Sequence, residues 1–275
     1  MVRKIEDIEL RLFLEALYQT FHYDFRSYSL ASIKRRMILA LEHFHCESYS
    51  QLQDRLLHQH DILPKLISYL TVQVSEFFRD PSYFKAIREQ VIPHLRTYPS
   101  LKVWIAGCGA GEEAYSMAIL FREEGLEQRT MFYATDINQD ALRRAESGVY
   151  EIDRLKLFTE NHRGSGATCS LSDYYTAAYG GAAFDKTLKK RILFSDHSIV
   201  TDAVFAEMHL ISCRNVLIYF NKELQDRALK LFNDSLIRKG FLGLGAKETL
   251  RFSGLADHFT EFSREERIYQ KKAVA

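Results

Sequence analysis

A glycine-rich segment, GCGAGEE at residues 107–113, has the residue types in this chain best suited to ligand binding. The apolar run 103–106 before it predicts a buried strand, and the stretch 112–124 after it predicts an amphipathic helix. Glycines at such a turn let a ligand approach the backbone closely, and the first amide groups of a helix have no partner within the helix. Gly107 and Gly109 are therefore candidate cofactor-binding residues. The spacing alone is compatible with NAD, flavin or S-adenosylmethionine.

Three acidic residues near this segment favour one of those cofactors. Glu112 and Glu113 lie at the predicted helix start, which disfavours a pyrophosphate, whereas a cofactor with an ammonium and a sulfonium group tolerates carboxylates there. Asp136 ends the next predicted strand, 130–135, where a carboxylate can accept both hydroxyl groups of a ribose. The alternative is that Asp136 caps the following helix. The acids thus favour S-adenosylmethionine over a dinucleotide.

Helical periodicity dominates the first part of the chain. Apolar residues recur at helical spacing in two segments, the first with Ile5, Ile8, Leu12 and Ala16 and the second with Ile33, Met37, Leu41 and Phe44. We therefore expect an all-α N-terminal domain with a linker helix over residues 1–98.

Strand and helix patterns alternate in residues 99–275, which we expect to form an α/β domain. After the βαβ unit around the glycine-rich segment, the pattern predicts a strand at 208–212, a helix at 222–237, a strand at 240–245 and a closing hairpin at 259–270. Aromatic residues around Gly180-Gly181 predict a small antiparallel excursion within 150–195.

Composition excludes several classes of protein. The 37 Lys and Arg nearly balance the 36 Asp and Glu, so overall charge gives no reason to expect nucleic acid as a partner. The four cysteines lack a paired spacing, which favours a reducing cytoplasm, and the start of the chain has no apolar run that predicts membrane insertion. His43, His45 and Cys46 lack a fourth ligand at a suitable spacing, so we expect no metal site.

Four motifs in order carry a resemblance to a known family: SEFFRDPSYF (75–84), VWIAGCGAGEEAYSMAI (103–119), YATDINQDALRRAESGVY (133–150) and CRNVLIYFNKE (213–223). With the basic residues Lys34, Arg35 and Arg36, they resemble the chemotaxis receptor methyltransferases, the CheR family. The resemblance implies a class I S-adenosylmethionine-dependent methyltransferase, with a Rossmann-like seven-stranded sheet, an inserted small β-subdomain and an all-α N-terminal domain.

The resemblance also implies an activity and a location. The enzyme would be a protein-glutamate O-methyltransferase that converts glutamate side chains of methyl-accepting chemotaxis receptors into γ-methyl esters and releases S-adenosyl-L-homocysteine. It would be cytoplasmic and recruited to receptor arrays.

Roles for individual residues follow from the same resemblance. Arg79 and Tyr219 take catalytic positions, and Lys34, Arg35 and Arg36 form a docking surface for an acidic receptor. Cofactor contacts are expected from Gln73, Ser75, Arg79, one of Glu112 and Glu113, Asp136, Ser198, Ile199, Arg214 and Asn215. The chain departs from the family at Gln73-Val74-Ser75, where Asn-x-Thr is usual, and at Ser198-Ile199, where Asn-Leu is usual. Apolar Leu39 or Leu41 stands where a second basic position is usual.

Each of these roles has a structural alternative. Arg79 could pair with Asp80, Arg214 could form a salt bridge within the fold, Tyr219 could only pack beside Phe220, and the basic run could be a solvated helix face. The chemistry needs no general base, because a glutamate with an ordinary pKa of about 4.3 is already ionised at neutral pH.

Two other functions remain open. A binding or regulatory protein could keep the fold with weak or no transfer, as the changes at Gln73 and Ser198 suggest. A methyltransferase for nucleic acid or small molecules is disfavoured, because charge is near neutral and an Asn/Asp-Pro-Pro-Tyr motif is absent.

Overall fold

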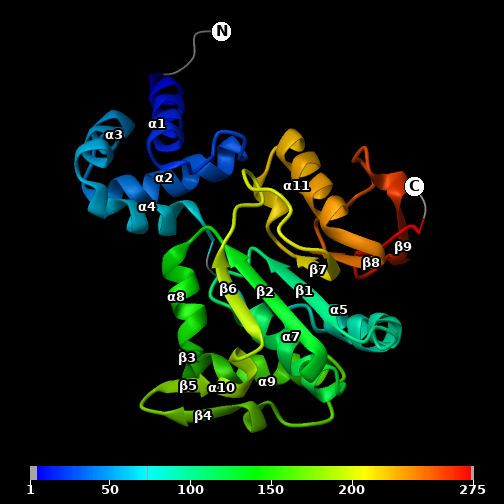
Figure 1. The fold of residues 1–275 in the computed structure, drawn as a ribbon. Helices are drawn as coiled ribbons and strands as arrows, with labels where there is room; N and C mark the ends of the chain where they lie inside the picture. Colours follow the sequence, from blue (N-terminus) through cyan, green and yellow to red (C-terminus); the bar gives the residue numbers. More distant parts are fainter. Residues whose placement is uncertain (1–4, 73, 274–275) are drawn as a thin grey trace. The chain divides into compact units, whose positions relative to one another are not determined.

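The computed structural model describes residues 5–72 and 74–273, drawn in Figure 1. The chain forms two compact units, one of residues 1–72 with 219–227 and the other of residues 73–218 with 228–275. The division thus falls at residue 72 rather than near residue 98. A second difference from the expected organisation is that Tyr219 belongs to the helical unit.

The helical unit begins with four α-helices and a short 3-10 turn: α1 (Ile5–Phe21), α2 (Leu30–Phe44), α3 (Tyr49–His58), η1 (His60–Ile62) and α4 (Leu63–Leu70). Ser48 is the N-cap of α3, and its side chain accepts a hydrogen bond from Gln51 N. His45 is the C-cap of α2 and has the left-handed conformation.

The inward face of α1 corrects the sequence interpretation. The helix is present, but Ile5, Ile8 and Leu12 are exposed, and the buried residues are Leu10, Phe13, Leu14 and Leu17. Both sets have helical spacing, so periodicity alone could not decide between them. In α2, by contrast, the expected residues Ile33, Met37 and Phe44 are buried.

The second unit is built on a seven-stranded sheet in the order β6-β2-β1-β7-β8-β10-β9. The first five of these strands are parallel, and β10 runs antiparallel to both β8 and β9. The strands are β1 (Leu101–Ala106), β2 (Thr130–Asp136), β6 (Ile192–Asp196), β7 (Met208–Cys213), β8 (Leu236–Leu244), β9 (Phe259–Ser263) and β10 (Ile268–Lys271). The strand order reverses between β1 and β7, where open α/β sheets bind ligands.

Helices and a small second sheet complete this unit. The α-helices and one π-helix (η2) of this unit are α5 (Pro81–Ala86), η2 (Ile87–Val91), α6 (Ile92–Leu95), α7 (Glu112–Glu123), α8 (Gln139–Ser147), α9 (Leu155–Gly164) and α10 (Lys186–Lys189). Short turns are η3 (Glu127–Arg129), η4 (Ile152–Arg154), η5 (Leu171–Tyr174) and η7 (Ala256–His258). The elements α11 (Lys222–Ser235) and η6 (Leu217–Tyr219) each contribute residues to both units. An antiparallel sheet β3-β5-β4 is formed by β3 (Val149–Glu151), β4 (Tyr175–Ala178) and β5 (Gly181–Phe184).

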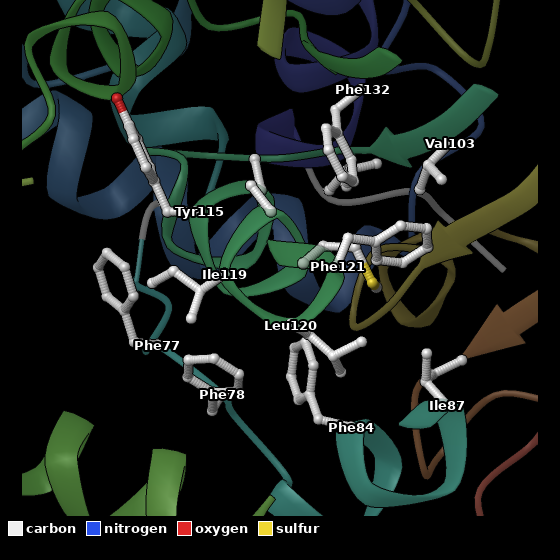
Figure 2. Close-up of a cluster of buried hydrophobic side chains, with 14 of the residues drawn as sticks. Phe77, Phe78, Phe84, Ile87, Val103, Tyr115, Ile119, Leu120, Phe121 and Phe132 are labelled. Atoms are coloured by element: carbon white, nitrogen blue, oxygen red, sulfur yellow. The ribbon is translucent and has the colours of Figure 1, made fainter. Parts of the chain in front are cut away.

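Aromatic residues anchor the segment that leads to Arg79. Phe77 and Phe78 are fully buried and gather beside α7 with Tyr115, as Figure 2 shows. The Phe77 ring stacks on Phe184 with centroids 4.3 Å apart. Burial of two large rings stabilises this segment strongly, so the residues that follow are held at the edge of the core. None of the described helices has the length and apolar character needed to cross a membrane.

Candidate cofactor site and active-site residues

The turn at residues 107–111 lies at the carboxyl ends of β1 and β2. Gly107 N and Cys108 N both donate to Thr135 O, at 2.8 and 2.9 Å. Gly107 has a φ of +74° and Gly111 a φ of +93°, which side chains rarely adopt. A Cβ on Gly107 would also lie 2.6 Å from Val216 Cγ2. The glycines therefore set both the course of the turn and its contact with the loop after β7.

Asp136 ties this turn to the end of β2. Its Oδ2 accepts a hydrogen bond from Gly109 N and its Oδ1 accepts one from Asn138 N, both at 2.9 Å. Asn138, not Asp136, is the N-cap of α8, because its side chain accepts from Ala141 N at 3.0 Å. The capping alternative for Asp136 is therefore wrong. Burial raises the pKa of Asp136, and its two oxygens retain acceptor capacity for ligand hydroxyls.

The two glutamates at the start of α7 have different partners, which the sequence did not distinguish. Glu113 is fully engaged: Oε1 accepts from Ser212 Oγ at 2.6 Å and Oε2 pairs with Arg214 Nη1 at 3.1 Å. Glu112 is only 1% exposed and its Oε2 has no hydrogen-bond partner among the described residues. Burial raises the pKa of Glu112. An unpaired buried carboxylate oxygen suits a cationic ligand group, so Glu112 is the candidate contact.

Arg154, which sequence reasoning missed, holds the other oxygen of Glu112. Its Nη1 lies 3.3 Å from Glu112 Oε1, and its Nη2 donates to Ser75 O. One arginine thus connects the start of α7 with the segment that contains the expected cofactor residue Ser75. Nothing in the local sequence around Arg154 indicates this contact, because it depends on how α9 and the 74–80 segment pack.

Arg214 forms salt bridges within the fold, which was the alternative to its expected contact with the cofactor. Its side chain is 1% exposed and pairs with Glu113 and, through Nη2, with Asp80 Oδ2 at 2.7 Å. The same Nη2 donates to Arg79 O at 2.8 Å. Arg214 therefore fixes the main chain at Arg79, and Asp80 pairs with Arg214. The Arg79 side chain makes no hydrogen bond or ion pair with any residue the structure describes.

A second residue missed by sequence reasoning, Glu248, holds the loop after β7. Its carboxylate accepts from Asn215 N (3.0 Å), Val216 N (2.9 Å), Ile218 N (3.3 Å) and Gly245 N (2.6 Å). Burial raises the pKa of Glu248, and these backbone donors oppose the rise. Asn215 itself has a φ of +61°, a strained conformation that this cluster of hydrogen bonds can maintain. The one sequence signal for Glu248 was its place as an acidic residue shortly after the glycine-punctuated strand segment 240–245.

The remaining expected cofactor residues are Ser198, Ile199 and Gln73. The Ser198 hydroxyl accepts from Val200 N and Thr201 N, both at 3.2 Å, so it closes a local turn. Ile199 is buried. Gln73 lies outside the described residues.

The three basic residues of α2 are not equivalent. Lys34 forms an ion pair with Asp7, and Arg35 is exposed. Arg36 is 6% exposed, donates from Nη1 to Leu70 O at 2.6 Å, and lies with its guanidinium carbon 4.5 Å from the Tyr219 ring centroid. The expectation that Arg36 belongs to a docking surface is therefore corrected, because a buried guanidinium cannot present its charge to a partner.

Comparison with known proteins decides the family. The model of the CheR methyltransferase SAM-binding domain matches residues 73–268, and that of the CheR methyltransferase all-alpha domain matches residues 8–71. The chain belongs to the CheR methyltransferase family. Cher3 of Pseudomonas putida is 54% identical over 265 residues, covering 96% of this chain and 97% of the relative.

More distant relatives of this CheR-family chain carry a more specific name. A chemotaxis protein methyltransferase of Listeria innocua is 32% identical over 229 residues, covering 82% of this chain and 84% of the relative. The chemotaxis protein methyltransferase Cher2 of Pseudomonas putida is 26% identical over 264 residues, covering 91% and 92%. The expected class I methyltransferase fold and the cofactor S-adenosylmethionine are confirmed.

Proposed function

We propose that this CheR-family chain transfers a methyl group from S-adenosylmethionine to glutamate side chains of chemotaxis receptors, forming γ-methyl esters. The names of its relatives from Listeria innocua and Pseudomonas putida support a role in chemotaxis. The observation that carries the choice of a carboxylate acceptor is the free guanidinium of Arg79.

Arg79 combines a fixed backbone with a side chain that has no partner in the described structure. Arg214 holds its carbonyl oxygen at 2.8 Å, and the buried rings of Phe77 and Phe78 precede it. A half-buried guanidinium that no acid among the described residues neutralises is suited to an anionic ligand, and its planar fork matches a carboxylate with two parallel hydrogen bonds. Asp80, the acid nearest in sequence, is paired with Arg214 instead.

The cofactor is assigned to the turn at residues 107–111 and the residues around it. Glu112 Oε2 would accept from the ammonium group, and Asp136 would accept from the ribose hydroxyls, since each has unused acceptor capacity. Gly107 and Gly109 allow close approach, and Ser75, Gln73, Asn215, Ser198 and Ile199 are further contacts on the family resemblance. When bound, S-adenosylmethionine supplies an electrophilic methyl group. Glu113 and Arg214 act by positioning rather than by contact.

The reaction requires no general acid or base from the protein. The acceptor glutamate is already ionised at neutral pH, so the chain must bind it, orient it and exclude water. Arg79 would hold the carboxylate with its planar fork. On the family resemblance, Tyr219 is the second proposed catalytic residue, with a hydroxyl that can donate a hydrogen bond without adding a charge. Lys34 and Arg35 remain the proposed docking charges for an acidic receptor helix, and recruitment to receptor arrays would follow from that docking.

The test is transfer of radiolabelled methyl from S-adenosylmethionine to membranes that contain candidate receptors. We expect label that base releases as volatile methanol, the signature of a methyl ester, and we expect its loss when the receptor glutamates are changed to glutamine. Arg79→Met should abolish most of the transfer. Calorimetric binding of S-adenosylmethionine without ester formation on any receptor would contradict the proposal and favour a binding or regulatory protein.

A further inference from the structure

The Tyr219 backbone is fixed within the helical unit by residues from the start of α2. Ser29 N donates to Tyr219 O at 2.7 Å, and Asn221 N donates to Ser27 O at 2.9 Å. These two hydrogen bonds form a short pairing between segments far apart in the sequence. They fix the main chain at Tyr219 but leave rotation about the side-chain bonds of the tyrosine free.

Arg36 supplies a contact to the ring itself. Its guanidinium carbon lies 4.5 Å from the Tyr219 ring centroid, within the range of a cation–π interaction. The guanidinium is in turn held by the hydrogen bond from Nη1 to Leu70 O at 2.6 Å, at the end of α4. The ring therefore rests against a cation whose own position is fixed by a second helix.

Packing alone does not explain an arginine here. Arg36 is 6% exposed, and its Nη2 is buried without a hydrogen-bond partner among the described residues. An unpaired buried donor on a charged group costs free energy, and an unbranched apolar side chain such as Met would fill similar space without that cost. Burial lowers the pKa of Arg36, and Tyr219 is the neighbour that most opposes this shift. Tyr219 is thus the group that the buried guanidinium contacts.

We propose that Arg36 is a positioning residue for Tyr219, whose guanidinium holds the ring so that the hydroxyl keeps one direction during methyl transfer. This inference rests on the proposed function for the assumption that Tyr219 acts on the substrate. It replaces the docking role expected from the sequence, and it separates Arg36 from its neighbours Lys34 and Arg35.

The activity test compares Arg36→Met with Arg11→Met, which removes an exposed arginine of the same unit. Arg36→Met should lower kcat for receptor methylation by roughly 3- to 30-fold, the range of a lost cation–π contact, with little change in receptor KM or cofactor affinity. Arg11→Met should leave kcat unchanged. In a Tyr219→Phe background, Arg36→Met should change kcat by less than about twofold, because the hydroxyl it positions is absent.

A second readout does not need transfer activity. In protein labelled with ¹⁵N-arginine, the side-chain N–H proton signals of Arg36 should be shifted upfield by the ring, and Tyr219→Leu should abolish the shift. This measurement uses native Arg36, so it also stands if Arg36→Met fails to fold. Absence of receptor methylation by the wild type would defeat the proposed function while leaving this shift in place. An ordinary Arg36 shift, or an equal kcat loss from Arg36→Met in both backgrounds, would overturn the positioning role.

Discussion

The start of α7 and the basic run of α2 each place charged residues side by side in the sequence, and in both the neighbours have different environments. Glu112 keeps a buried oxygen unpaired, whereas both oxygens of adjacent Glu113 are engaged. In α2, Lys34 is ion-paired, Arg35 is exposed and Arg36 is buried. Successive helical residues point about 100° apart, so a run of like residues cannot share one face.

The two regions differ in where the partners of their charged side chains come from. Glu113 is engaged by Ser212 and Arg214 at the carboxyl end of β7, a neighbour that parallel strand order places beside β1. Arg36 contacts the ring of Tyr219, and the fold class does not predict that contact, because the two residues come from distant parts of the sequence. A charged residue is therefore easier to assign where the fold class dictates its neighbours.

The largest effect should come from breaking the buried pair of the methyltransferase unit. Arg214→Met leaves Glu113 Oε2 and the Arg79 carbonyl without the guanidinium, and loss of one member of a buried ion pair typically costs about 3–5 kcal/mol. Urea unfolding followed by circular dichroism measures this loss. Lys230→Met, at an exposed pair with Asp234, is the control and should change stability by less than about 1 kcal/mol. Equal effects of the two variants would show that the Arg214 network is not structural.

The next effect distinguishes the two glutamates through the cofactor. Glu112→Gln should weaken S-adenosylmethionine by about 1.5–3 kcal/mol, because a charge-assisted hydrogen bond to the ammonium is lost. Calorimetry gives the affinity, and circular dichroism confirms that the variant is folded. An unchanged affinity would remove Glu112 from the site.

The same carboxylate should make cofactor affinity depend on pH. Burial raises the pKa of Glu112, so its proton is taken up at a higher pH than for an ordinary glutamate, whereas the ammonium group requires the ionised form. Affinity should therefore be full above the raised pKa and fall as pH is lowered through it. Glu112→Gln should flatten the part of the calorimetric pH profile that comes from this group; an unchanged profile would assign the dependence to another residue.

A smaller effect is expected at Arg154, whose charge lowers the pKa of Glu112. Arg154→Met should move the loss of affinity to higher pH, since the buried carboxylate loses its partner. Well above that range, affinity should fall by only about 0.5–1.5 kcal/mol, the net value of an ordinary hydrogen bond. Calorimetric pH profiles of the two proteins give the comparison, and superimposable profiles would contradict the role of Arg154.

The sequence patterns predicted most of the strand and helix order, because apolar runs and glycine turns are local signals, but they missed the edge strand β6 (Ile192–Asp196). It placed Gly107, Gly109, Glu112 and Asp136 around one turn, since strand, turn and helix follow one another in the chain. It could not identify Arg154 or Glu248, whose partners come from distant segments. It also chose the wrong face of α1, because apolar residues surround that helix on more than one side.

The smallest effect concerns docking and tests whether Lys34 and Arg35 act separately from Arg36. The Lys34 and Arg35 charges lie outside the Tyr219 contact; Arg35 is exposed, and Lys34 is half-buried and paired with Asp7. Charges near the surface act at long range by raising the rate of encounter with an acidic receptor. Replacing both with Met should raise receptor KM by roughly two- to fivefold and leave kcat unchanged, since surface charges contribute little individually.

Added salt should mimic the change, because the Debye length is about 8 Å at 0.15 M and shortens as the salt concentration rises. The double variant should therefore show a shallower salt dependence of KM than the wild type, with cofactor affinity unaltered. The comparison with Arg36→Met is decisive: that variant should lower kcat at constant KM, so the two sets of α2 residues would affect different kinetic constants. If Lys34 and Arg35 altered kcat instead, or had no effect on the salt slope, these two side chains would be part of a solvated surface and docking would lie elsewhere.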